Sequence, residues 1–150
     1  MILRLVAAAL AVTAAGPDAA PPGGFTFTDP AITESSGLVV DDATGEALFV
    51  TTNDSGDTGR VFTVDPTTGD TVGVTTWSQD PVDVEALAPA GPGEVWVADI
   101  GDNGAQRSSV SVALVPVGRG DATVEPRAEV ELRYPGGARD AETLLVDPDG

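Results

Sequence analysis

The chain has 150 residues, of which 24 are acidic and 7 are basic, giving a formal net charge of −17 at pH 7. This charge argues against nucleic acid as a partner, because phosphate binding needs a basic surface, and it disfavours anionic membranes in the same way. Histidine, cysteine and lysine are absent, so the chain cannot itself supply a Ser–His–Asp triad, a thiolate or lysine nucleophile, or a zinc site built from His or Cys.

Residues 1–24 are typical of a secretory signal peptide followed by a linker. Arg4 gives a positive charge, residues 5–15 are apolar or small, and residues 13–15 offer small side chains for cleavage. A stretch rich in proline and glycine follows at residues 16–24. The apolar run is too short to anchor the chain in a bilayer. We therefore expect a secreted, extracellular protein with no integral membrane span.

From residue 25 onward the sequence predicts short β-strands and no helix. Apolar and polar residues alternate with a period of two, as in residues 128–134, which is typical of half-buried strands. Turn sequences such as Asp65-Pro-Thr-Thr-Gly69 separate these segments. The predicted strands are residues 37–41, 47–52, 60–65 and 70–77, followed by 84–88, 94–99, 109–116 and 128–134.

An acidic motif recurs along the chain and divides it into units. Glu34 precedes the first unit, Asp83-Val-Glu85 opens the second, and Asp140-Ala-Glu142 opens a third. In both complete units a second strand leads to a corner rich in Asp, Asn and Gly, at 53–56 and at 99–103. The motif recurs at roughly 50 residues, which is close to the size of one four-stranded β-propeller blade.

We therefore predict an all-β protein, namely a β-propeller of four-stranded antiparallel blades, with a β-sandwich or barrel as the alternative. Blade one covers about residues 34–77, blade two covers about 83–134, and residues 140–150 begin a third. Propellers typically have four to eight blades, so residues 25–150 are expected to be the N-terminal part of a longer propeller. Alone, this part would expose strand edges and an apolar flank. Residues 25–28 are a candidate outer strand for the last blade.

Propeller geometry places both acidic regions of each unit on one rim. The first strand of a blade lines the channel and the second runs back, so the start of one and the end of the other meet. Residues two apart on a strand point to the same side, so each Asp-x-Glu directs two carboxylates together. Such oxygen donors suit Ca²⁺. The predicted metal ligands are Asp83, Glu85, Asp99, Asp102, Asn103, Asp140 and Glu142.

Other residues near the same rim are candidates for binding a ligand. They are Glu34, Asp54, Arg107 and Arg139. Arginines at this rim also support a competing interpretation, in which the acidic residues form structural ion pairs. Trp77 and Trp96 lie in strand patterns, and we expect them to pack in the core or between blades.

Several motifs together carry a family resemblance. They are Glu34-Ser-Ser-Gly-Leu, Asn53-Asp-Ser-Gly, Val84-Glu-Ala-Leu, Asp99-Ile-Gly-Asp-Asn with Arg107, and Asp140-Ala-Glu-Thr-Leu-Leu-Val-Asp-Pro. Over roughly residues 27–149 this set resembles a family of exported bacterial β-propeller proteins, loosely described as WD40-like or NHL-like. The resemblance implies a propeller fold and export, and it implies no activity. Members of that family often carry an aromatic residue where this chain has Val84.

The expected function is that of a secreted β-propeller that binds a partner and carries Ca²⁺ on an acidic rim. The candidate partners are a protein, a glycan or a small-molecule ligand. One alternative is a metal-dependent hydrolase for a phosphate or sugar ester, in which Arg107 or Arg139 would bind the anionic group. The other alternative is a purely structural propeller whose charge serves solubility. We favour binding over catalysis.

Overall fold

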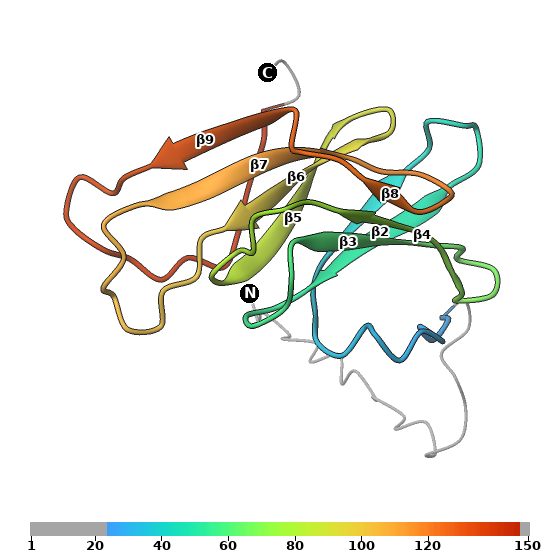
Figure 1. The fold of residues 1–150 in the computed structure, drawn as a ribbon, viewed down its shortest axis with the longest axis horizontal. Coiled ribbons are helices and arrows are strands. Elements are labelled where there is room, and N and C mark those ends of the chain that lie inside the picture. The colour runs from blue at the N-terminus through green and yellow to red at the C-terminus, as the bar shows by residue number, and fades with distance from the viewer. Residues whose placement is uncertain (1–23, 148–150) are drawn as a thin grey trace, which may run out of the picture.

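The computed structural model describes residues 24–147, which contain nine β-strands and no helix, so this part of the chain holds no helix that could cross a membrane (Figure 1). The predicted signal peptide lies in residues 1–23, outside the described residues. The strands are β1 (Ser35–Asp41), β2 (Leu48–Asn53), β3 (Arg60–Val64), β4 (Thr71–Thr76), β5 (Val84–Gly91), β6 (Glu94–Asp99), β7 (Val110–Pro116), β8 (Ala122–Thr123) and β9 (Ala128–Leu132).

The strands form two sheets, in the orders β1-β2-β3-β4-β8 and β5-β6-β7-β9. Neighbouring strands pair antiparallel, except for the short parallel pair of β4 and β8. Eight of the nine strands overlap the segments predicted from the sequence, which confirms the all-β fold and the two units. The ninth, β8, has two residues, too few for an alternating pattern to reveal it.

Residues 25–28 form no strand; they pack against the first sheet. The backbone N–H of Thr28 donates to the carbonyl oxygen of Gly69 in the turn between β3 and β4, at 3.0 Å. The ring of Phe25 lies 5.0 Å from that of Phe49 on β2. This segment therefore covers the face of the first sheet that points away from the second sheet.

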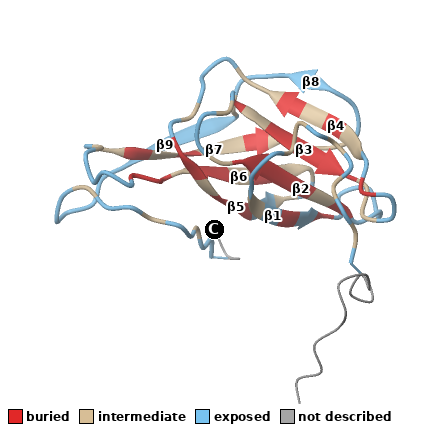
Figure 2. Cartoon of the chain, turned by 90° about the horizontal axis from the view of Figure 1, so that it is seen from below, coloured by how far each residue is buried: buried red, intermediate tan, exposed pale blue. Residues whose placement is uncertain are grey.

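The main core lies between the facing surfaces of the two sheets, where Figure 2 shows buried residues on adjacent strands. Its members are Val39, Val50, Val61, Val84, Leu87, Val95, Val97 and Val115. All are at most 9% exposed, and fully burying one such side chain contributes about 1.5–3 kcal/mol. Gly37 lets β1 approach β5 closely, because a Cβ there would lie 2.8 Å from the backbone nitrogen of Leu87.

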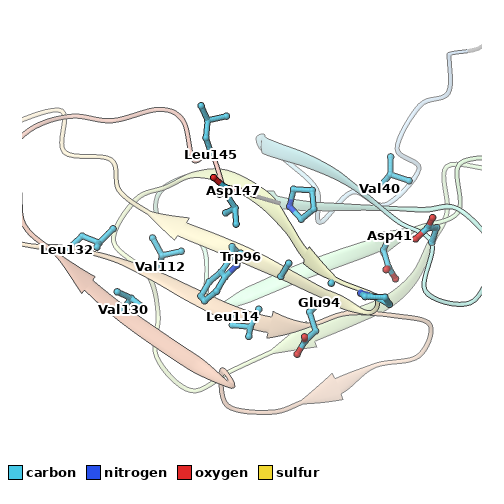
Figure 3. Close-up of a pocket in the computed structure, with 16 residues that line it drawn as sticks. Val40, Asp41, Glu94, Trp96, Val112, Leu114, Val130, Leu132, Leu145 and Asp147 are labelled. Carbon is cyan, nitrogen blue, oxygen red and sulfur yellow. The ribbon is translucent and has the colours of Figure 1, made fainter. Parts of the chain in front are cut away.

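The opposite face of the second sheet is apolar but only partly covered. Its buried members are Ala86, Ala98, Ile100, Val110 and Val112. Val130 and Leu132 on β9 are 44% and 43% exposed beside them. A groove of about 880 Å³ lies over this face, and Figure 3 places Trp96 and Leu114 on its sheet side and Leu145 on the C-terminal segment. The apolar flank predicted from the sequence is therefore present.

Candidate functional site

The two sheets fix their first strands in the same way. At the end of β2, Asn53 Oδ1 accepts a hydrogen bond from the backbone N–H of Glu34, 3.3 Å away. At the end of β6, Asp99 Oδ1 accepts one from the backbone N–H of Asp83, 2.8 Å away. In each unit the side chain that ends the second strand thus holds the segment that leads into the first strand. The acidic regions before the first strand and after the second therefore lie at the same end of each sheet.

Five carboxylates converge at this end, where the two sheets meet the segment after β9. Asp54 follows β2, Asp83 and Glu85 lie at the start of β5, and Asp140 and Glu142 lie after β9. Oxygens of Asp54, Asp83 and Glu85 lie within 4.8 Å of one another, and so do oxygens of Glu85, Asp140 and Glu142. Glu85 therefore stands between two groups of ligand atoms. We call these five residues the rim cluster.

Gly101 makes room for the rim cluster at the return corner of the second sheet. Its backbone N–H donates to the carbonyl oxygen of Asp83 at 3.0 Å. A Cβ at this position would overlap the carboxylate of Asp83 and lie 2.6 Å from Glu85 Oε1. The side chains of Asp83 and Glu85 can therefore lie against the corner only because residue 101 has no side chain.

Asp83 is the most buried member of the cluster, with 8% of the residue exposed. Its Oδ1 atom is fully buried and has no hydrogen-bond partner in the described part of the chain. Buried polar atoms are nearly always hydrogen-bonded, and a buried charge without a partner costs free energy. None of the ion pairs between described residues includes a member of the rim cluster. The Oδ1 atom is thus available as a ligand.

The electrostatics of the cluster favour protonation of its central members. Burial raises the pKa of Glu85 to about 7, and the charge of Asp54 and a hydrogen bond and charge from Glu142 add to this rise. Burial also raises the pKa of Asp83, with further contributions from Asp54 and Asp140. Like charges close together disfavour ionisation. A bound cation would remove this penalty.

The carboxylates at the return corner are held differently. Asp102 is buried, and its two oxygens accept backbone N–H bonds from Gln106 at 2.9 Å and from Arg107 at 2.8 Å. Asp99 Oδ1 also accepts a hydrogen bond from Arg107 Nη1 at 2.8 Å, in an ion pair. Two of the predicted metal ligands, Asp99 and Asp102, therefore already have donors that fix the turn.

The remaining predicted site residues lie around the cluster. Asn103 is exposed in the turn, and Glu34 is exposed while its carbonyl oxygen accepts the N–H of Asp54 at 3.0 Å. Arg139 is exposed, and its Nη1 donates to the carbonyl oxygen of Ala138 at 3.3 Å. Of the seven predicted metal ligands, the structure brings four into the rim cluster. It adds Asp54, which the sequence had indicated as a ligand-binding residue.

No protein-family model matches the chain, and neither a curated protein nor a solved structure matches it. The function is therefore inferred from the geometry and charge of the site alone.

Proposed function

We propose that the two sheets are blades of a β-propeller and that the rim cluster binds a divalent cation, Ca²⁺. The observation that carries the cation site is the buried Oδ1 of Asp83, which has no partner in the described chain and lies on a residue of the cluster. An unpartnered buried carboxylate oxygen among four other carboxylates is stabilised by a cation.

The propeller is supported by the arrangement of the two units. Each consists of four strands that are consecutive in the sequence, apart from the short β8 between β7 and β9. Their first strands lie side by side, with Ser36 Oγ donating to Glu85 Oε2 at 3.4 Å across the junction. Both units also use the same corner hydrogen bond. Repetition of one four-stranded unit is typical of propellers, and a β-sandwich does not require it.

The choice of Ca²⁺ follows from the type and origin of the donors. Ca²⁺ takes about six to eight oxygen ligands in flexible geometry, whereas Mg²⁺ requires a nearly ideal octahedron and keeps several waters. The cluster offers five carboxylates from three separate segments of the chain. A set assembled in this way adapts to the larger cation more readily than to the smaller one.

A binding role is favoured over hydrolysis by the state of the arginines. The hydrolase alternative requires an arginine that receives the anionic group of the substrate. Arg107 Nη1 instead donates to Asp99 Oδ1 at 2.8 Å and to the carbonyl oxygen of Gly101 at 2.7 Å. Its guanidinium is therefore engaged in holding the corner. We propose a cation-dependent binding protein.

Calorimetric titration of the full chain tests this proposal. We expect CaCl₂ to give a saturable heat and to raise the melting temperature relative to EDTA, with a weaker response to MgCl₂. Asp83→Asn should reduce the Ca²⁺ affinity by about thirtyfold, equivalent to about 2 kcal/mol. The matched control is Glu129→Gln, which removes an exposed carboxylate on β9 outside the cluster and should leave the affinity unchanged. No saturable heat and equal melting temperatures in CaCl₂ and EDTA would refute the site.

A further inference from the structure

Residues 140–147 connect the rim cluster to the apolar face of the second sheet. Asp140 and Glu142 belong to the cluster, whereas Ala141 and Leu144 pack against the buried residues of that face. The segment therefore has one set of side chains at the charged site and another on the apolar surface. Any change in the position of the carboxylates moves the apolar side chains with them.

The segment occupies a place equivalent to the start of β5. Beside Asp83 and Glu85, the side chains of Val84 and Leu87 are buried in the core between the sheets. Ala141 and Leu144 stand at the same offsets from Asp140 and Glu142, and they contact the other face of the second sheet. The same sequence pattern thus meets the preceding sheet in the same manner at both positions.

The two positions differ in how firmly they are held. Val84 is 1% exposed and lies in a hydrogen-bonded strand, whereas residues 140–147 form no strand and Leu145 is 89% exposed. A hydrogen bond from the backbone N–H of Asp102 to Asp140 Oδ1, 2.8 Å long, helps to hold the segment. Segments with few buried contacts open at low free-energy cost. Residues 140–147 are therefore the part of the site that can be displaced.

Repulsion within the cluster acts on this segment. Asp83 and Glu85 are fixed at the start of β5, and Asp54 is fixed by its backbone N–H bond to Glu34. Like charges only a few ångströms apart repel, most strongly where water is excluded. Asp140 and Glu142 lie outside the regular strands and can relieve this repulsion by moving away. A cation reverses the force, because it attracts all five carboxylates.

We propose that Ca²⁺ binding fixes residues 140–147 over the second sheet, so that the cation controls how much of its apolar face is exposed. This inference rests on the proposed cation site and adds its consequence for an interaction surface. With Ca²⁺, the segment covers part of the face around Val112. Without Ca²⁺, the segment moves away and the groove that contains Trp96 opens.

Two readouts on the full chain test the coupling. The first is hydrogen–deuterium exchange, in which Ca²⁺ should slow exchange of residues 140–147 by about tenfold or more. The second is fluorescence of Trp96, measured in a Trp77→Phe background because the chain has two tryptophans. We expect a shift of the emission to shorter wavelength and release of a hydrophobic dye, with the same midpoint as the calorimetric titration.

A pair of variants separates the segment from the cation. Leu144→Ala keeps all five carboxylates, so it should still bind Ca²⁺ in the calorimeter while retaining more dye than the wild type. Asp140→Asn combined with Glu142→Gln should bind Ca²⁺ more weakly and show no change in Trp96 emission or exchange at residues 140–147. Saturable heat in the wild type without slower exchange would overturn the coupling and leave the cation site standing. Absence of heat would overturn both proposals.

Discussion

The return corner and the rim cluster of the second sheet are both acidic, yet their carboxylates are held in opposite ways. At the corner, Asp102 accepts two backbone N–H bonds and Asp99 pairs with Arg107. In the cluster, Asp83 has a buried oxygen without a partner in the described chain, and the pKa of Glu85 is raised to about 7 by burial and by neighbouring carboxylates. The supply of donors, rather than the number of acidic residues, therefore distinguishes a structural carboxylate from a cation ligand.

The largest effect on stability is expected at the corner. Asp102→Ala removes a buried acceptor and leaves the N–H groups of Gln106 and Arg107 without it, which should lower the free energy of unfolding by about 3 kcal/mol. Urea denaturation in EDTA measures this loss. The Ca²⁺ affinity of the folded variant should change much less than that of Asp83→Asn. Normal stability with abolished Ca²⁺ binding would place Asp102 among the ligands and break the distinction.

Asp83→Asn should act in the opposite direction on the metal-free protein. The substitution removes a buried charge that lies beside other carboxylates, so the free energy of unfolding in EDTA should rise by about 1 kcal/mol. Urea denaturation in EDTA and in CaCl₂ measures both states. The variant should also gain little stability from Ca²⁺, unlike the wild type. A loss of stability in EDTA would show that Asp83 is structural, like Asp99.

Gly101→Ala sharpens the comparison because it forces a side chain between the corner and the cluster. The new methyl group would overlap the carboxylate of Asp83, and overpacking of this kind costs about 1–3 kcal/mol. We expect a lower melting temperature and weaker Ca²⁺ binding together. Gly104→Ala in the same turn is the control, since its Cβ would meet the end of the flexible Gln106 side chain. Equal melting temperatures for the two variants would contradict the close approach.

The smallest effect is expected from pH. The pKa of Glu85 is raised from 4.5 to about 7 in the folded state, so between these values the folded protein binds more protons than the unfolded chain. The free energy of unfolding in EDTA should therefore decrease as the pH rises from about 4.5 to about 7, and the penalty is fully present above 7. Saturating Ca²⁺ should reduce this decrease. Thermal melts across this range measure it, and a rise in stability with pH would be the contrary result.

Much of the fold could be predicted because each main strand has residues with opposite environments on its two faces. The alternation of Val110, Val112 and Leu114 identified β7 in this way, and the repeat placed Asp83 and Asp140 in equivalent positions. The sequence could not reveal β8, which is stabilised by pairing with β4 rather than by its own pattern.

The division of the acidic residues into two kinds also needed the structure. Asp102 has donors because the turn after it folds back, with Ala105 at a φ of 48° and its N–H bonded to the carbonyl oxygen of Asp102 at 2.7 Å. A non-glycine residue in this conformation is uncommon, so the pattern of residue types gave no sign of it. The same composition therefore supported ligands at both regions.

The most direct test of the cation site is a crystal structure of the full chain grown with CaCl₂, with data collected for anomalous scattering. We predict an anomalous peak between Asp83 and Glu85, with carboxylate oxygens at about 2.3–2.6 Å from the ion and with Asp140 or Glu142 among its ligands. Density for water alone at this position, with the five carboxylates placed as in the metal-free protein, would contradict the account.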